Sequence, residues 1–134
     1  MNTLELNKQV VKRFNKEFLE EGDKSILKDI ISEEFVNHTI PAGFPNDVTG
    51  LIKFGEILHQ GFPDLSITIH EQTAENDLVS SLKTIEGTHL GEMIGKQATG
   101  KKVKITVIDM VRLKDGKYVD HWGKNDLMQV MQQL

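Results

Sequence analysis

The chain has 134 residues, of which 38% are apolar and 27% charged, a balance that predicts one folded globular domain over residues 1–134 rather than a disordered segment. Its net charge of −4, with basic residues scattered among acidic ones, argues against nucleic acid as a partner. The absence of cysteine excludes disulfides and thiolate metal sites. No apolar run approaches membrane-spanning length and the polar N-terminal residues do not resemble a secretory signal, so we expect no membrane partner and a cytoplasmic location.

The first half of the chain predicts three amphipathic helices. Apolar residues recur at helical spacing over residues 6–18, 26–31 and 51–58. Gly22 offers a left-handed stop after the first helix, and Asp23 and Thr49 are the expected caps of the second and third. Gly61 then ends the third helix. The segment at residues 39–50, which contains two prolines and two glycines, is expected to be a loop.

After Pro63 the hydrophobic period changes from helical spacing to alternation, which is typical of strands. We expect strands near residues 65–69, 78–90, 102–113 and 117–123. Asp126 is expected to cap a terminal segment over residues 127–134. Because the helices come first and the strands second, the chain is predicted to be an α+β protein in which helices pack against an antiparallel sheet.

An acidic residue interrupts the apolar face of the third predicted strand. Asp109 lies in the middle of a row that alternation places on one face, formed by Val103, Ile105, Val107, Val111 and Leu113. Such a residue is either a hydrogen-bonded structural Asp or a functional group in an apolar pocket. The opposite face carries Ile108, Met110 and Trp122, which is too apolar to be left in water and is expected to contact a second subunit.

The turn after this strand decides what lies beside Asp109. With Asp115-Gly116 in a two-residue loop, Asp109 would face Trp122, whereas a three-residue loop would place it opposite His121. We favour the second register because it pairs apolar residues with apolar residues. Asp109 could then orient and charge His121, or be a desolvated acid with a raised pKa, and either arrangement suits acid–base work on a C–H or C–O bond.

Two further patterns favour simpler interpretations. Residues 95–101 match most of a phosphate-binding loop, but Lys102 replaces the required Ser or Thr and a strand follows where a helix is needed, so we interpret them as a connection between strands. The five histidines show no close spacing typical of metal ligands, and we predict no metal site.

Several short motifs occur in an order that is characteristic of a known family. They are Phe35-Val36-Asn37-His38, Phe62-Pro63-Asp64-Leu65, residues 87–95 (GTHLGEMIG), Thr99-Gly100-Lys101, Asp115-Gly116-Lys117, Asp120-His121-Trp122 and Asp126. The ordered set resembles the SnoaL-like polyketide cyclases, also called predicted ester cyclases, of the nuclear transport factor 2-like superfamily. The resemblance implies a cone-shaped, cystatin-like fold, in which a strongly bent sheet wraps around helices, with a ligand cavity at the wide end and frequent dimers. It also implies cofactor-free acid–base chemistry that closes a ring next to carbonyl groups.

Carried over residue by residue, the resemblance places the pocket at Asn37, Val107, Asp109, His121 and Gly123. The chain departs from the family at two positions. The catalytic Asp that follows Trp in the cyclases is Gly123 here, and the family's His or polar partner at position 109 is an Asp. Either the carboxylate has moved across the hairpin to Asp109, or cyclase activity has been lost and ligand binding retained.

We therefore expect a cofactor-independent cyclase, isomerase or lyase that acts on a small apolar or carbonyl-containing ligand, with Asp109 as the acid–base group and His121 as its partner. Expected substrate-binding residues are Asn37, His38, Phe54, Leu58, His89, Met93 and Val107. The alternative is a non-catalytic ligand-binding domain of the same fold, in which Asp109 and His121 only satisfy each other.

Overall fold

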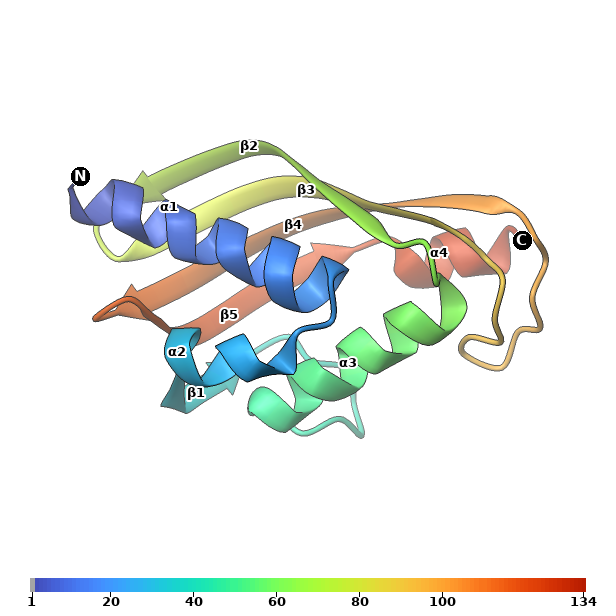
Figure 1. Ribbon diagram of the computed structural model, residues 1–134, viewed down its shortest axis with the longest axis horizontal. Helices are drawn as coiled ribbons and strands as arrows, with labels where there is room; N and C mark the ends of the chain where they lie inside the picture. Colours follow the sequence, from blue (N-terminus) through green and yellow to red (C-terminus); the bar gives the residue numbers. More distant parts are fainter. Residues whose placement is uncertain (1) are drawn as a thin grey trace.

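The structure is a computed structural model that describes residues 2–134, and it places the helices against one face of a curved five-stranded sheet (Figure 1). The helices are α1 (Thr3–Arg13), the π-helix η1 (Phe14–Glu20), the 3-10 helix η2 (Lys24–Ile26), α2 (Leu27–Ile30), α3 (Val48–Gly61) and α4 (Leu127–Gln132). The strands are β1 (Ile31–Asn37), β2 (Ser66–Glu75), β3 (Leu78–Thr88), β4 (Lys102–Lys114) and β5 (Lys117–Asn125). The predicted α+β fold is confirmed.

The strand order is β1-β5-β4-β3-β2. All neighbours are antiparallel except the edge strand β1, which runs parallel to β5. The sequence did not lead us to expect β1, because the polar residues 32–34 interrupt the alternation, and of its seven residues only Ile31, Phe35 and Asn37 are buried. This strand matters for function, since it carries Asn37 to the side of β5.

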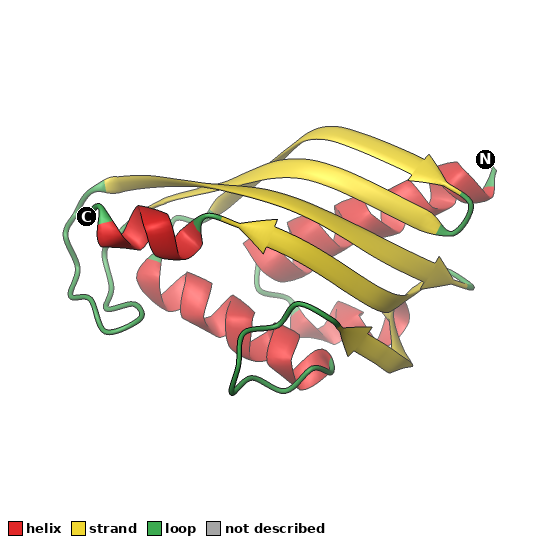
Figure 2. Ribbon diagram, turned by 180° about the vertical axis from the view of Figure 1, so that it is seen from behind, coloured by secondary structure: helices red, strands yellow, loops and turns green. Residues whose placement is uncertain are grey.

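The two faces of the sheet differ as the alternation in β4 predicts. Every second residue of β4, from Val103 to Leu113, is buried, and Asp109 lies within this buried row. α1 and α3 cover this face, while the view from behind shows the other face without a covering helix (Figure 2). On that uncovered face Ile108 is 61% exposed and Met110 is 39% exposed.

Some helix boundaries differ from those expected. α1 begins earlier than its apolar pattern and continues into η1 up to Gly22, whose φ of +78° ends it as predicted. Asp23 caps the second helix by accepting the Ser25 N–H. Asp47, and not Thr49, caps α3, because its carboxylate accepts the N–H of Thr49.

The expectation that Asp126 caps the terminal helix is wrong. α4 does begin after it, but the Asp126 carboxylate accepts the backbone N–H of Thr106 in β4 instead, so it fastens α4 to the sheet. The segment that resembles a phosphate-binding loop joins β3 to β4 without a helix. None of the helices in residues 2–134 combines the length and the apolar character needed to cross a membrane.

Candidate active site

A cavity of about 500 Å³ lies between the buried face of the sheet and the helices. Its wall is mostly apolar, with a small number of polar side chains, which is typical of small-molecule sites. Most of the residues predicted from the sequence are in this wall, namely Asn37, Phe54, Leu58, Met93, Val107, Asp109 and His121.

Two of the predicted substrate-binding residues are not in the wall. His38 follows the end of β1 and turns away from the cavity, where its ring stacks on Trp122 with centroids 4.8 Å apart and its Nε2 lies 2.7 Å from an Asp120 oxygen. His89 is fully buried beyond the end of β3, and its Nδ1 bonds to Thr99. Neither histidine is among the residues that line the cavity, which differs from the expectation.

The predicted hairpin register is also wrong. Asp115 and Gly116 form a two-residue turn with φ values of +53° and +76°, so Lys114 pairs with Lys117. The register then shifts by one residue, because Arg112 pairs with Asp120 while the next residue, Leu113, pairs with Tyr118. This bulge, which the sequence gives no local reason to expect, places Asp109 opposite Gly123 and not opposite His121.

Asp109 and His121 nevertheless meet across the hairpin. His121 pairs with Val111, so its ring reaches Asp109 diagonally and places Nε2 3.5 Å from Oδ2 of the carboxylate. This distance suits a charge contact but is longer than an ordinary hydrogen bond. The missing side chain at Gly123 makes the approach possible, since a Cβ there would lie 3.0 Å from Cε1 of His121 and 3.3 Å from Cβ of Asp109.

Lys83 is the functional residue that we did not expect. It lies on the buried face of β3, and its ammonium is 3.0 Å from Oδ2 of Asp109 with only 4% of its side chain exposed. The ammonium also donates to Oδ1 of Asn15 at 2.6 Å, and the Asn15 amide donates to the carbonyl of Val11 at 2.9 Å. Alternation from Val79 to Ile85 would have placed Lys83 on the buried face.

The charge of Asp109 is fixed by these neighbours. Burial alone would raise the pKa of Asp109, but the Lys83 ammonium and the His121 ring outweigh burial and lower the pKa to about 2. The sequence-based alternative of a protonated Asp109 with a raised pKa is therefore wrong. Oδ1 of Asp109 has no hydrogen-bond partner among the described residues and is closed off from water-sized space.

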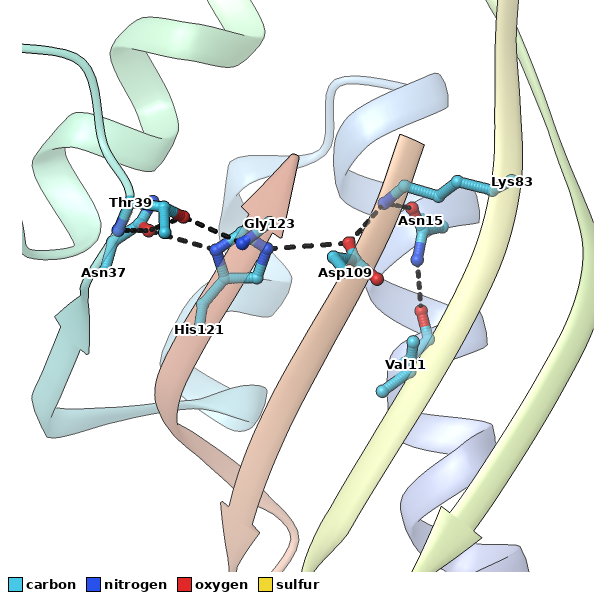
Figure 3. A network of polar contacts seen from close by, with 8 residues as sticks. All are labelled: Val11, Asn15, Asn37, Thr39, Lys83, Asp109, His121 and Gly123. Carbon is cyan, nitrogen blue, oxygen red and sulfur yellow. Dashed lines mark hydrogen bonds and ion pairs between the residues drawn. The ribbon is translucent and has the colours of Figure 1, made fainter. Parts of the chain in front are cut away.

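On the other side, His121 is held by Asn37 and Thr39. The backbone N–H of Thr39 donates to Oδ1 of Asn37 at 3.2 Å, which fixes that oxygen as the acceptor facing the ring. Nδ1 of His121 is 3.0 Å from the same oxygen, within hydrogen-bonding distance, which favours a proton on this nitrogen in the neutral ring. Figure 3 shows the resulting row of contacts, which runs from Val11 through Lys83, Asp109 and His121 to Thr39.

The π-helix η1 contributes Asn15 to this row, next to Val11 of α1. It turns Asn15 toward Lys83 and places Phe14 and Phe18 in the cavity wall. A π-helical stretch is rare and is often found at functional sites, because the wider turn changes which side chains face the same way. The helical spacing in the sequence gave no reason to expect it.

Comparison with known proteins identifies the family. The model of the SnoaL-like polyketide cyclases matches residues 9–134. The chain belongs to this family. A search of curated proteins found no significant match. The solved structures that resemble this SnoaL-like chain have the nuclear transport factor 2-like fold expected from the sequence.

Three of these structures show the likeness. IdmH, a proposed polyketide cyclase from Streptomyces antibioticus, is 27% identical with a TM-score of 0.82, and the match covers 95% of this chain and 96% of IdmH. A proposed polyketide cyclase from Bacillus cereus is 25% identical with a TM-score of 0.83, covering 96% and 79% of the two chains. AclR, a proposed hydroxylase from Streptomyces galilaeus, is 25% identical with a TM-score of 0.82, covering 98% and 84%. Solved structures of this similarity therefore carry more than one proposed chemistry.

Proposed function

We propose that the protein is a cofactor-independent enzyme of the cyclase or isomerase type, which moves a proton at a carbon next to a carbonyl group. The observation that supports this most is the position of His121. Its Nδ1 faces the fixed acceptor oxygen of Asn37, while its Nε2 lies over Gly123 in the cavity wall, 3.5 Å from a carboxylate that stays ionised.

The geometry favours a reversal of the two roles expected from the sequence. Both oxygens of Asp109 are occupied or closed off, since Oδ2 faces Lys83 and His121 and Oδ1 is enclosed. His121 has 21% of its side chain exposed, so its Nε2 is the better candidate for proton transfer with a ligand. Asp109 would then stabilise the positive charge that the ring gains.

In this mechanism Nε2 of His121 takes the proton from the carbon, and the electron pair of the broken C–H bond passes to the carbonyl oxygen as an enolate. The enolate carbon then attacks a second carbonyl carbon of the same ligand, which closes a ring. In an isomerase, a conjugated enolate is instead protonated at a different carbon, which gives an isomer. The protonated ring returns its proton to the product, so no cofactor is consumed.

The carboxylate position supports the same proposal. Asp109 is the direct cross-strand partner of Gly123, the position at which the resemblance places the catalytic Asp of the family. Relative to the family, the carboxylate lies one strand away, on a residue of the cavity wall whose oxygens face Lys83, His121 and packed protein. The apolar wall suits a small apolar ligand that carries a carbonyl group.

Proton exchange at carbon tests this function without knowledge of the natural substrate. We would incubate the protein with 2-tetralone, a two-ring ketone with an acidic C–H, in deuterated buffer and follow the loss of the C1 proton signal by NMR. The wild-type chain should accelerate exchange over buffer, and His121→Asn should abolish the acceleration. Asp109→Asn should reduce it by at least tenfold.

The matched control is His38→Asn. His38 also pairs with an aspartate, Asp120, but outside the cavity, so its removal should leave exchange unchanged. Equal exchange in wild type and His121→Asn would refute the proposed role of His121.

A non-catalytic ligand-binding domain is the second candidate. It is favoured by the near-complete pairing of the polar groups, because Lys83, Asp109 and Asn37 all have partners within the protein. Saturable binding of 2-tetralone with no exchange above the buffer rate would favour this candidate over the enzyme.

We further propose that the protein is a homodimer that forms through the uncovered face of the sheet. Leu82 pairs with Ile108 and Met110 pairs with Trp122 across neighbouring strands of this face. The first three of these residues are each at least 37% exposed, which makes a contiguous apolar patch that a second copy could cover. The cytoplasmic location stays a prediction.

A further inference from the structure

Tyr118 has a buried hydroxyl that the proposed mechanism does not use. The residue is 2% exposed and lies in the cavity wall. Its ring stacks on Phe14 with centroids 4.9 Å apart and packs against Phe35 at 6.4 Å. Within residues 2–134 no hydrogen bond to the hydroxyl is formed, and the groups that shift its pKa include no hydrogen-bond partner. Buried tyrosine hydroxyls usually have a partner, so this one calls for an explanation.

Tyr118 lines the cavity, and its hydroxyl differs from the enclosed polar atoms of the interior. Other unpaired polar atoms of the interior, such as Oδ1 of Asp109 and Oγ of Ser81, are closed off from water-sized space, and the Tyr118 hydroxyl is not one of these enclosed atoms. Because aromatic rings cover the side chain elsewhere, the cavity is the space that the hydroxyl can reach.

The bulge in β5 places this hydroxyl and His121 in the same cavity. Residues three apart in a regular strand point to opposite faces, but the extra residue between Tyr118 and His121 lets both side chains point inward. The cavity wall therefore includes the side chains of both Tyr118 and His121, which come from the same strand.

We infer that the Tyr118 hydroxyl is a ligand-binding donor that hydrogen-bonds to a carbonyl or enol oxygen of the ligand while the ligand's reacting carbon lies near His121. Burial raises the pKa of Tyr118 well above 10, and the negative charge of Asp109 adds to the effect. The phenol therefore stays protonated and can act as a hydrogen-bond donor. The inference rests on the proposed function, because it assumes an oxygen-bearing ligand in this cavity.

A pair of probes that differ only in the oxygen tests this inference. We would measure the binding of 2-tetralone and of tetralin, its parent hydrocarbon, to wild type and to Tyr118→Phe by equilibrium dialysis. Since one hydrogen bond contributes about 0.5–1.5 kcal/mol, the substitution should weaken 2-tetralone binding by about 2- to 10-fold and leave tetralin binding unchanged. Equal effects on both probes, including no binding of either, would overturn the inference.

A second measurement does not depend on the variant. Tyr118 is the single tyrosine of the chain, so protein labelled with ¹³C at the tyrosine Cζ gives one signal from this side chain. Saturating 2-tetralone should shift this signal and tetralin should not, whereas identical spectra in the two complexes would contradict a hydrogen bond. Binding through Tyr118 without proton exchange would refute the enzymatic function and leave this inference intact.

Discussion

Replacement of Lys83 by Met should destabilise the protein strongly at neutral pH. The two side chains have a similar length, but Met lacks the ammonium that lies 3.0 Å from Asp109. The carboxylate would then remain buried with only the His121 ring beside it. Removing one partner of a buried ion pair typically costs about 3–5 kcal/mol, and we expect a loss of about 3 kcal/mol because His121 can compensate in part.

The pKa of Asp109 gives an independent magnitude. Burial would raise this pKa, yet the nearby positive charges lower it from 3.8 to about 2, which corresponds to roughly 2 kcal/mol in favour of the folded state at pH 7. Since the folded pKa is below the unfolded value, this contribution is present above about pH 4 and is lost as the pH falls toward 2.

Lys83→Met should reverse this dependence. Without the ammonium, burial raises the pKa of Asp109 above its unfolded value, so the variant has a penalty at pH 7 that disappears when the carboxyl group is protonated. The difference in stability between wild type and variant should therefore be largest at pH 7 and smaller near pH 4.

The assay is urea unfolding of wild type, Lys83→Met, Asp109→Asn and the double variant at both pH values. We expect a coupling energy of about 2 kcal/mol or more at pH 7. Lys16→Met is the matched control, because the Lys16 side chain is 63% exposed and solvent screens its ion pair with Glu20, so its removal should leave the stability nearly unchanged. A loss of less than about 1 kcal/mol in Lys83→Met, with unchanged pH dependence, would refute this description of the ion pair.

Two further substitutions test the site and the uncovered face of the sheet. Gly123→Asp should displace the His121 ring, since a Cβ at this position would lie 3.0 Å from Cε1 of that ring. Proton exchange of 2-tetralone should then fall at least tenfold. Unchanged exchange would show that the close approach of the ring is not needed. Ile108→Lys should convert the proposed dimer into a monomer in sedimentation velocity, because it places a charge in the apolar patch. Leu90→Lys, at a 56% exposed loop position, should not. A monomeric wild type would refute the dimer.

The sequence was sufficient for the features that depend on local periodicity. The helical spacing that leads to Gly22 and the alternation in β4 predicted the α+β architecture and placed Asp109 on the buried face. The same alternation in β3 would have placed Lys83 inside, but we did not expect it there, because a lysine in a strand is usually exposed and its partners Asp109 and Asn15 come from other elements.

The features that could not be predicted depend on contacts between distant segments. The parallel pairing of β1 with β5 has no signature in the polar residues 32–34, and it brings Asn37 to His121 across 84 positions of sequence. The bulge near Tyr118 changes the register by one residue, and no turn rule specifies it. His38 was misplaced for a related reason, since the face toward which it turns is set by the end of β1.

The tautomer of His121 is the property on which the proposed chemistry depends most directly, and it can be measured without a substrate. In ¹⁵N-labelled protein, long-range proton–nitrogen correlation spectra distinguish the two ring nitrogens, and comparison with His121→Asn identifies this residue among the five histidines. With the neutral ring we expect the proton on Nδ1, facing Oδ1 of Asn37, and an unprotonated Nε2 over Gly123. A proton on Nε2, directed at Asp109, would leave no basic nitrogen toward the cavity and would contradict the proposed mechanism.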